Sequence, residues 1–97
     1  MLQNGSSLYI GVMSGTSVDA IDTALCNCKA DKTFLLACES FPISEELRGD
    51  ITAMSVAEVI NIDLLGSLHI RLGFAFSEAV LNFMKTINLN NSDVAAI

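Results

Sequence analysis

The sequence predicts an α/β chain in which an antiparallel three-stranded meander comes first and helices follow. Three apolar segments of strand length lie within residues 8–42, and the polar stretches between them are short enough for hairpins. Beyond residue 44, apolar residues recur every three or four positions, which is the period of an amphipathic helix. Hydrophobic residues make up 52% of the 97 residues, so the chain must bury much of itself, as expected for one small domain.

The first strand is predicted over Leu8 to Met13, and a loop of small residues at 14–19 follows it. Ser14-Gly15-Thr16-Ser17 lets the backbone turn sharply, leaves amide N–H groups unobstructed and adds hydroxyl donors. Such a strand, loop and strand can cradle a phosphate. The same residue types are also common in an ordinary hairpin turn, which is the structural alternative.

The second and third strands are predicted over 20–28 and 33–41. Along the second strand, Ile21, Thr23 and Leu25 face one way, and Asp22, Ala24, Cys26 and Cys28 face the other. A polar turn at 29–32 joins the two strands, and Pro42 ends the third.

Helices are predicted over 44–88. Ser44 before two glutamates is typical of a helix start, and we expect a short helix to about Ala53. Ser55 and Glu58 have the spacing of a capping box and predict that a longer helix starts there. Its apolar stripe is Ile60, Leu64, Leu68, Leu72, Phe76, Val80, Phe83 and Ile87. Gly66 and Gly73 predict a kink, a break or close packing within it.

The last residues, 93–97, begin another apolar segment after a turn. We interpret them as the start of a strand that is cut short, so the chain is expected to be truncated.

Composition excludes several classes of function. Eleven acidic and five basic side chains give a net charge of −6, and no basic cluster is present, so nucleic acid and anionic membranes are poor partners. Residues 1–5 lack the features of a secretory signal, and no uninterrupted apolar stretch reaches membrane-spanning length, which predicts a cytoplasmic protein.

Isolated reactive side chains give weak signals. Cys26, Cys28 and Cys38 are odd in number and lie in apolar runs, so we expect free buried thiols rather than disulfides or a zinc site. His69 has no partner at ligand spacing and is expected to be structural, as are Phe74 and Phe76, which we expect to pack in the core.

The string Met13-Ser14-Gly15-Thr16-Ser17-Val18-Asp19-Ala20-Ile21-Asp22 closely resembles the N-terminal signature of the anhydro-N-acetylmuramic acid kinases, M-S-G-T-S-x-D-G-[IV]-D. Residues 68–80 resemble a helix of the same family, with Leu72, Gly73, Phe76, Ala79 and Val80 in step. Two positions depart from the pattern. Ala20 replaces the usual glycine, and Met13 stands where the wider actin-like superfamily often has an acidic residue.

The resemblance implies that residues 1–97 form part of the N-terminal lobe of an actin-like or ribonuclease-H-like ATPase. It implies an ATP-dependent kinase that converts 1,6-anhydro-N-acetylmuramic acid to N-acetylmuramic acid 6-phosphate in cell-wall recycling, with a catalytic base beyond this chain. The implied ATP-binding loop is Gly15, Thr16, Ser17, Val18, Asp19, Ala20, Ile21 and Asp22. Asp19 and Asp22 are the candidates for holding Mg²⁺, directly or through water, although either acid could instead cap the loop by accepting its backbone N–H groups.

We therefore expect a nucleotide and a small sugar as partners, self-association or a homodimer through the helical stripe, and little or no kinase turnover by the 97 residues alone. The alternative is a non-catalytic interaction or assembly module of the same half-lobe fold, with the 14–19 segment as an ordinary turn.

Overall fold

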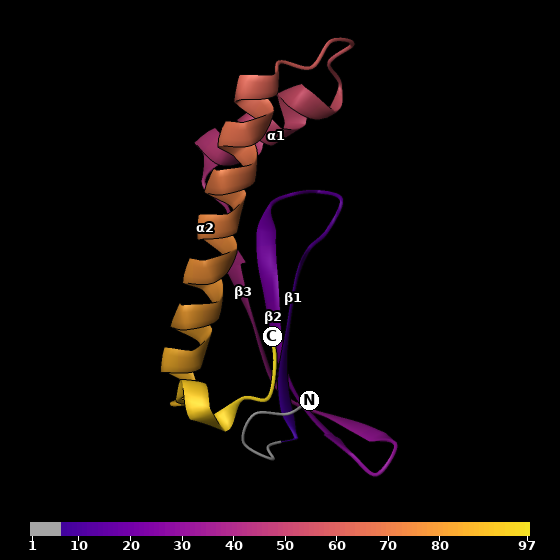
Figure 1. Cartoon of the computed structure of the whole chain (residues 1–97), viewed down its shortest axis with the longest axis vertical. Coiled ribbons are helices and arrows are strands. Elements are labelled where there is room, and N and C mark those ends of the chain that lie inside the picture. The colour runs from indigo at the N-terminus through magenta and orange to yellow at the C-terminus, as the bar shows by residue number, and fades with distance from the viewer. Residues whose placement is uncertain (1–6) are drawn as a thin grey trace.

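The computed structural model describes residues 7–97, so residues 1–5, which the sequence analysis examined for a secretory signal, lie outside the described part. Strands precede helices in the chain, as predicted. The long helix runs beside the meander, and the short one lies beyond one end of the sheet (Figure 1). The elements are β1 (Leu8–Ser14), β2 (Ala20–Lys29), β3 (Lys32–Pro42), α1 (Glu45–Ser55), α2 (Ile62–Thr86) and the 3-10 turn η1 (Asn91–Asp93).

The three strands form one antiparallel sheet in the order β1-β2-β3, which confirms the predicted meander. Met13 on β1 pairs with Asp22 on β2, and Ala24 pairs with Cys38 on β3. The register between β2 and β3 shifts at Leu25/Cys26. Ile21, Thr23 and Leu25 share one face of β2, as the alternation predicts, and the structure shows that this face is buried.

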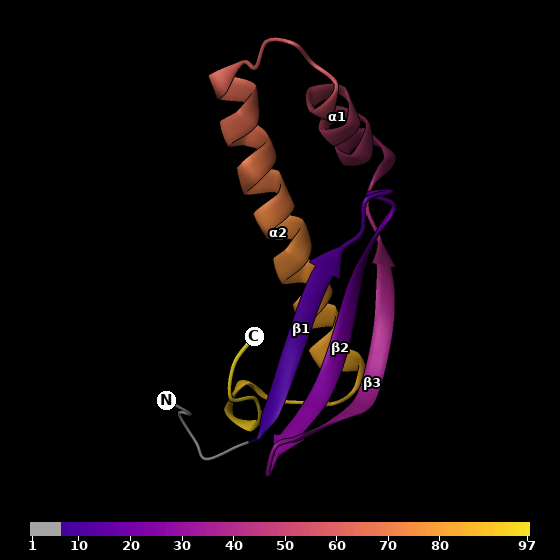
Figure 2. The same cartoon turned by 90° about the vertical axis from the view of Figure 1, so that its right-hand side faces the viewer.

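The segment after η1 returns to the free edge of β1 (Figure 2). The Ala95 N–H donates to the Leu8 carbonyl at 2.8 Å, and the Ile10 N–H donates to the Ala96 carbonyl at 3.1 Å. Tyr9 and Ala96 form a parallel bridge. Antiparallel strands followed by helices and a parallel return to β1 are consistent with the N-terminal region of an actin-like or ribonuclease-H-like ATPase.

Two clusters of buried side chains join the sheet to the helices. The first lies between the sheet and the second half of α2 and consists of Ile10, Leu25, Val80, Phe83, Met84 and Val94. The second lies nearer α1 and consists of Ile21, Ile43, Leu47, Leu68 and Ala79. The predicted stripe is thus buried at Leu68, Val80 and Phe83, whereas Ile60 and Leu64 at its beginning are exposed.

The start of α1 is confirmed, because the Ser44 side chain accepts a hydrogen bond from the Leu47 N–H at 3.2 Å. The predicted capping box at Ser55 is wrong. Ser55 is the last residue of α1, and its hydroxyl donates backwards to the Thr52 carbonyl at 2.8 Å. The helix α2 begins after Asn61, whose side chain caps two backbone N–H groups. Serine and asparagine are similarly good caps, and here the asparagine begins the helix.

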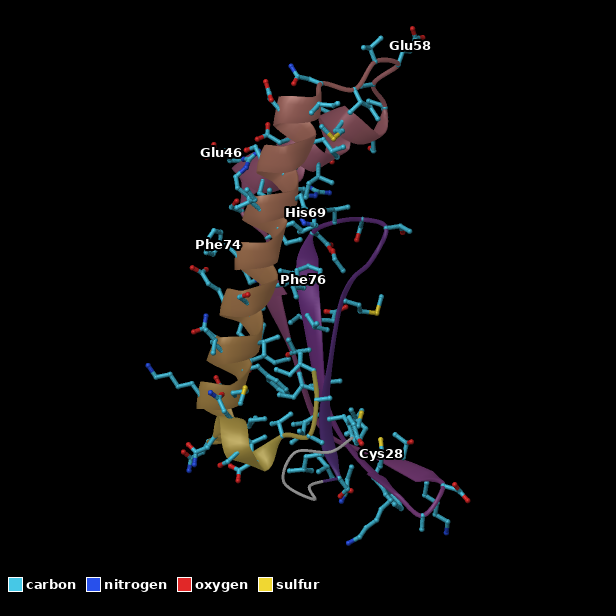
Figure 3. All side chains as sticks on the ribbon, in the orientation of Figure 1. Cys28, Glu46, Glu58, His69, Phe74 and Phe76 are labelled. Atoms are coloured by element: carbon cyan, nitrogen blue, oxygen red, sulfur yellow. The ribbon has the colours of Figure 1, made fainter. Side chains whose placement is uncertain are left out.

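The helix α2 continues unbroken through Gly66 and Gly73. A side chain added at either glycine would meet nothing within 4 Å, so neither residue marks a break or a close approach to the sheet. Phe76 packs against the second cluster, but Phe74 points away from the sheet and is 68% exposed (Figure 3). The core position predicted for Phe74 is wrong, because residues two apart on a helix lie on nearly opposite sides.

The described cysteines form no disulfide with one another. Only Cys26 is partly buried, whereas Cys28 and Cys38 are exposed, so the expectation of buried thiols is wrong for these two. Cys28 lies on the part of the β2–β3 hairpin that projects away from α2 (Figure 3). Because this part of the hairpin projects from the rest of the fold, no helix covers it (Figure 3).

By length and composition alone, α2 could cross a membrane. It has 25 residues, its most apolar window has a mean hydropathy of 1.3, and that window is 17% buried. One such helix is weak evidence, because core helices of soluble proteins can have the same length and composition. Here α2 packs on the sheet and carries Arg71, which forms an ion pair with Asp50 of α1 at 2.9 Å.

Candidate phosphate-binding loop

The connection between β1 and β2 is a tight loop at the end of the sheet nearest α1 (Figures 1 and 2). The Val18 N–H donates to the Gly15 carbonyl at 3.1 Å, which closes a turn. The Ser14 hydroxyl donates to the Ala20 carbonyl at 3.1 Å across the base of the loop. Gly15, Thr16 and Ser17 remain exposed at its tip. The loop is therefore shaped by its own hydrogen bonds and is open to a ligand from solvent.

Two bonds from outside the loop hold its second half. The Ile43 N–H, between β3 and α1, donates to the Asp19 carbonyl at 3.0 Å. The Arg48 Nε of α1 donates to the Ser17 carbonyl at 3.3 Å. Sequence reasoning missed Arg48, because nothing in the local pattern around it indicates contact with a loop so far away in the chain.

The two candidate metal ligands accept hydrogen bonds from hydroxyl groups. Asp19 Oδ1 accepts from the Ser17 hydroxyl at 2.9 Å, and Asp22 Oδ1 accepts from the Ser40 hydroxyl of β3. Capping of the loop would require bonds from its backbone N–H groups to these carboxylates, and the described residues show the hydroxyl bonds instead. Both acids are exposed, so a cation could reach them.

Asp22 lies on the face of the sheet that α2 does not cover, directly across from Met13. Paired residues on adjacent antiparallel strands have neighbouring side chains. The carboxylate therefore lies beside the position at which the wider actin-like superfamily often has an acidic residue.

The apolar members of the predicted loop anchor it instead of facing solvent. Ile21 is 2% exposed and belongs to the second core cluster, and Val18 packs against that cluster. Val18 has a φ of 54°, an unfavourable value for a β-branched residue, whereas Ala20 is not among the residues with positive φ. The alanine in place of glycine therefore requires no strained backbone at position 20.

The candidate loop lies outside one of the larger cavities of the described residues. That cavity has a volume of about 520 Å³ and lies between the end of β3, α1 and α2. Of the predicted site residues, only Ile21 lines it. The part of the chain described by the structure holds no group of three or more His, Cys, Asp or Glu suited to a metal ion. Any Mg²⁺ at Asp19 or Asp22 would therefore complete its oxygen ligands from phosphate and water.

Comparison with known proteins identifies the family. Residues 7–97 match the family model for anhydro-N-acetylmuramic acid kinase. The chain belongs to the anhydro-N-acetylmuramic acid kinase family. This confirms the family that the 13–22 string and the 68–80 helix indicate.

Relatives in the anhydro-N-acetylmuramic acid kinase family match nearly all of this chain. It is 40% identical over 92 residues to the anhydro-N-acetylmuramic acid kinase of Sulfurimonas denitrificans, covering 95% of this chain and 25% of that protein. It is 35% identical over 89 residues to the kinase of the same name from Aliivibrio fischeri, covering 92% of this chain and 24% of that protein. The chain thus spans about a quarter of the length of these relatives.

Proposed function

We propose that residues 15–19 bind the phosphates of ATP in a kinase of the anhydro-N-acetylmuramic acid type, and that this chain supplies the first part of its N-terminal lobe. The observation that carries the proposal is an exposed loop of Gly15, Thr16 and Ser17 held in a fixed shape. Phosphoryl transfer depends mainly on positioning the donor and neutralising its charge, and a rigid row of N–H and hydroxyl donors serves that purpose.

Asp19 and Asp22 favour the magnesium complex of the nucleotide over the free nucleotide. A carboxylate beside the loop repels phosphate oxygens unless a cation lies between them. Carboxylate, phosphate and water oxygens are the ligands that Mg²⁺ prefers. We therefore propose that Asp19, Asp22 or both hold Mg²⁺, directly or through water. When bound, the ion would neutralise charge on the transferred phosphoryl group.

The substrate is proposed from the family. In this proposal, ATP phosphorylates 1,6-anhydro-N-acetylmuramic acid while water opens the anhydro bridge, which yields N-acetylmuramic acid 6-phosphate in the cytoplasm. No catalytic base is assigned to the residues of this chain. Its contribution is to hold the phosphates, and we expect little or no turnover by the 97 residues alone.

Nucleotide titration of the chain followed by NMR tests phosphate binding. Mg·ATP and Mg·tripolyphosphate are expected to shift the amide signals of Gly15, Thr16 and Ser17 while leaving the distant β2–β3 turn unchanged. ATP with EDTA is expected to bind more weakly, because Asp19 then lacks its cation. Absence of any shift at the loop at millimolar ligand would refute the assignment.

A chimaera tests the kinase assignment. Residues 7–97 replace the matching quarter of the Sulfurimonas denitrificans relative, and release of sugar phosphate is measured with the unaltered relative as control. We expect the chimaera to be active, and we expect Asp19→Ala to abolish that activity. Activity that survives both Asp19→Ala and Gly15→Val would show that the loop does not hold the nucleotide.

A non-catalytic assembly module is the second candidate, and the exposed apolar surface favours it. Large apolar side chains are exposed on α2 and on the loop before it, including Val59, Ile62, Ile70, Phe74 and Leu81. Exposed apolar surface of this extent is typical of a contact with another protein surface. Since Leu68, Val80 and Phe83 are buried in the chain's own core, self-association would use the exposed set. Sedimentation that shows a monomer at high concentration would contradict this candidate.

A further inference from the structure

One cation of the chain is joined to the candidate loop. Arg48 donates from Nε to the Ser17 carbonyl at 3.3 Å. The other arginine, Arg71, is engaged by Asp50. Lys29 and Lys32 flank the β2–β3 turn, and Lys85 lies near the end of α2. In a chain of net charge −6, Arg48 is therefore the described cation that is bonded to the loop.

The chemistry of the guanidinium suits this place. Arginine presents its donors in a rigid planar fork, so the bond from Nε fixes the direction of the two terminal nitrogens. The two terminal nitrogens of Arg48 make no hydrogen bond to a described residue. They carry positive charge and match phosphate oxygens in geometry.

The loop also requires restraint. Val18 is held at a φ of 54°, and a β-branched residue in this region stores strain that surrounding bonds must offset. Arg48 holds the carbonyl of the preceding residue, while the side chain of that residue donates to Asp19. Loss of Arg48 would release one of the bonds that keep the turn in shape and remove the positive charge that is bonded to the loop.

We propose that Arg48 is the positioning residue of the phosphate loop: it fixes the Ser17 carbonyl through Nε and brings a positive charge to the loop, so that the loop accepts phosphate. This inference rests on the proposed phosphate binding by residues 15–19. Under this inference, α1 contributes to nucleotide binding through a residue that lies outside the 13–22 string.

Three variants of the full chain separate the two contributions of Arg48. Arg48→Ala removes the bond and the charge, Arg48→Lys restores charge, and Arg48→Gln restores a neutral donor. We expect Arg48→Ala to weaken Mg·ATP binding roughly five- to tenfold, as for loss of a partly exposed charge contact. Arg48→Lys should recover the salt dependence and part of the affinity, and Arg48→Gln should recover part of the affinity without the salt dependence. Lys85→Ala, which changes net charge equally at a distant site, should bind as the unaltered chain does.

The outcomes distinguish this inference from the proposed function. If the unaltered chain binds neither Mg·ATP nor Mg·tripolyphosphate, the phosphate loop itself is refuted. If it binds and Arg48→Ala has the same affinity, the loop assignment stands and the role of Arg48 is refuted. Equal recovery of the salt dependence by Arg48→Gln would overturn the charge contribution. Without ligand, Arg48→Ala should speed hydrogen exchange of the Val18 amide severalfold, and an unchanged rate would refute the positioning contribution.

Discussion

Gly15→Ala separates ligand approach from folding at the tip of the loop. A β-carbon built at Gly15 meets no atom within 4 Å, and the residue does not have the left-handed φ that would disfavour alanine. The substitution should therefore leave the fold intact, and the reduced entropy of the unfolded chain should raise stability by about 0.4–1 kcal/mol.

Phosphate binding should respond in the opposite direction. Glycine lets a ligand reach the backbone N–H groups closely, and a methyl group at this tip would stand in the way. Loss of one charge-assisted hydrogen bond costs about 1.5–3 kcal/mol. At about 1.4 kcal/mol for each factor of ten, the dissociation constant for Mg·ATP should rise roughly ten- to hundredfold.

Gly11→Ala is the matched control for this prediction. Gly11 is exposed on β1, and an added β-carbon there also meets nothing within 4 Å. The melting temperature and the NMR-derived affinity of both variants would be measured together. Equal affinity in the two variants would refute phosphate approach at Gly15, and a marked fall in the melting temperature of Gly15→Ala would contradict the open space at this position.

Further substitutions test the ion site and the core. Asp19→Asn should abolish most of the advantage of Mg·ATP over free ATP, and an unchanged preference in paired titrations would exclude Asp19 as a magnesium ligand. Phe83 is 1% exposed, so Phe83→Ala should lower the free energy of unfolding by about 3–5 kcal/mol, as measured by urea denaturation. Thr23→Val leaves the Glu39 carbonyl without its 2.9 Å hydroxyl donor and should cost about 1–3 kcal/mol; a neutral result would contradict the importance of that bond.

Much of the fold could be predicted because its signals are local. Ile21, Thr23 and Leu25 alternate along one strand, so their place on a single sheet face follows directly from the sequence. The start of α1 could also be predicted locally, because Ser44 directly precedes two glutamates and caps the helix. Local rules failed where two signals compete within a few residues. Ser55 and Asn61 are both good caps, and the capping-box spacing of Ser55 and Glu58 favours the serine although Asn61 begins the helix.

The candidate loop could be located from the sequence, but not the bonds that hold it. The 13–22 string is contiguous, so its small residues and hydroxyls stand out. Arg48 and Ser40 reach the site from α1 and β3, and those contacts depend on how the chain folds back. The left-handed Val18 was equally inaccessible, since glycine and asparagine are the residues that normally signal that conformation.

The parallel bridge between Tyr9 and Ala96 has a consequence for the order in which the chain folds. The turns that join the three strands close over short separations, so the meander and its loop can form while synthesis continues. The bridge joins residues from nearly opposite ends of the chain and carries a larger loop-closure entropy. We therefore expect the candidate loop to emerge from the ribosome on a hairpin that already has its final pairing, while the outer edge of β1 is covered only after residues 95 and 96 have been made.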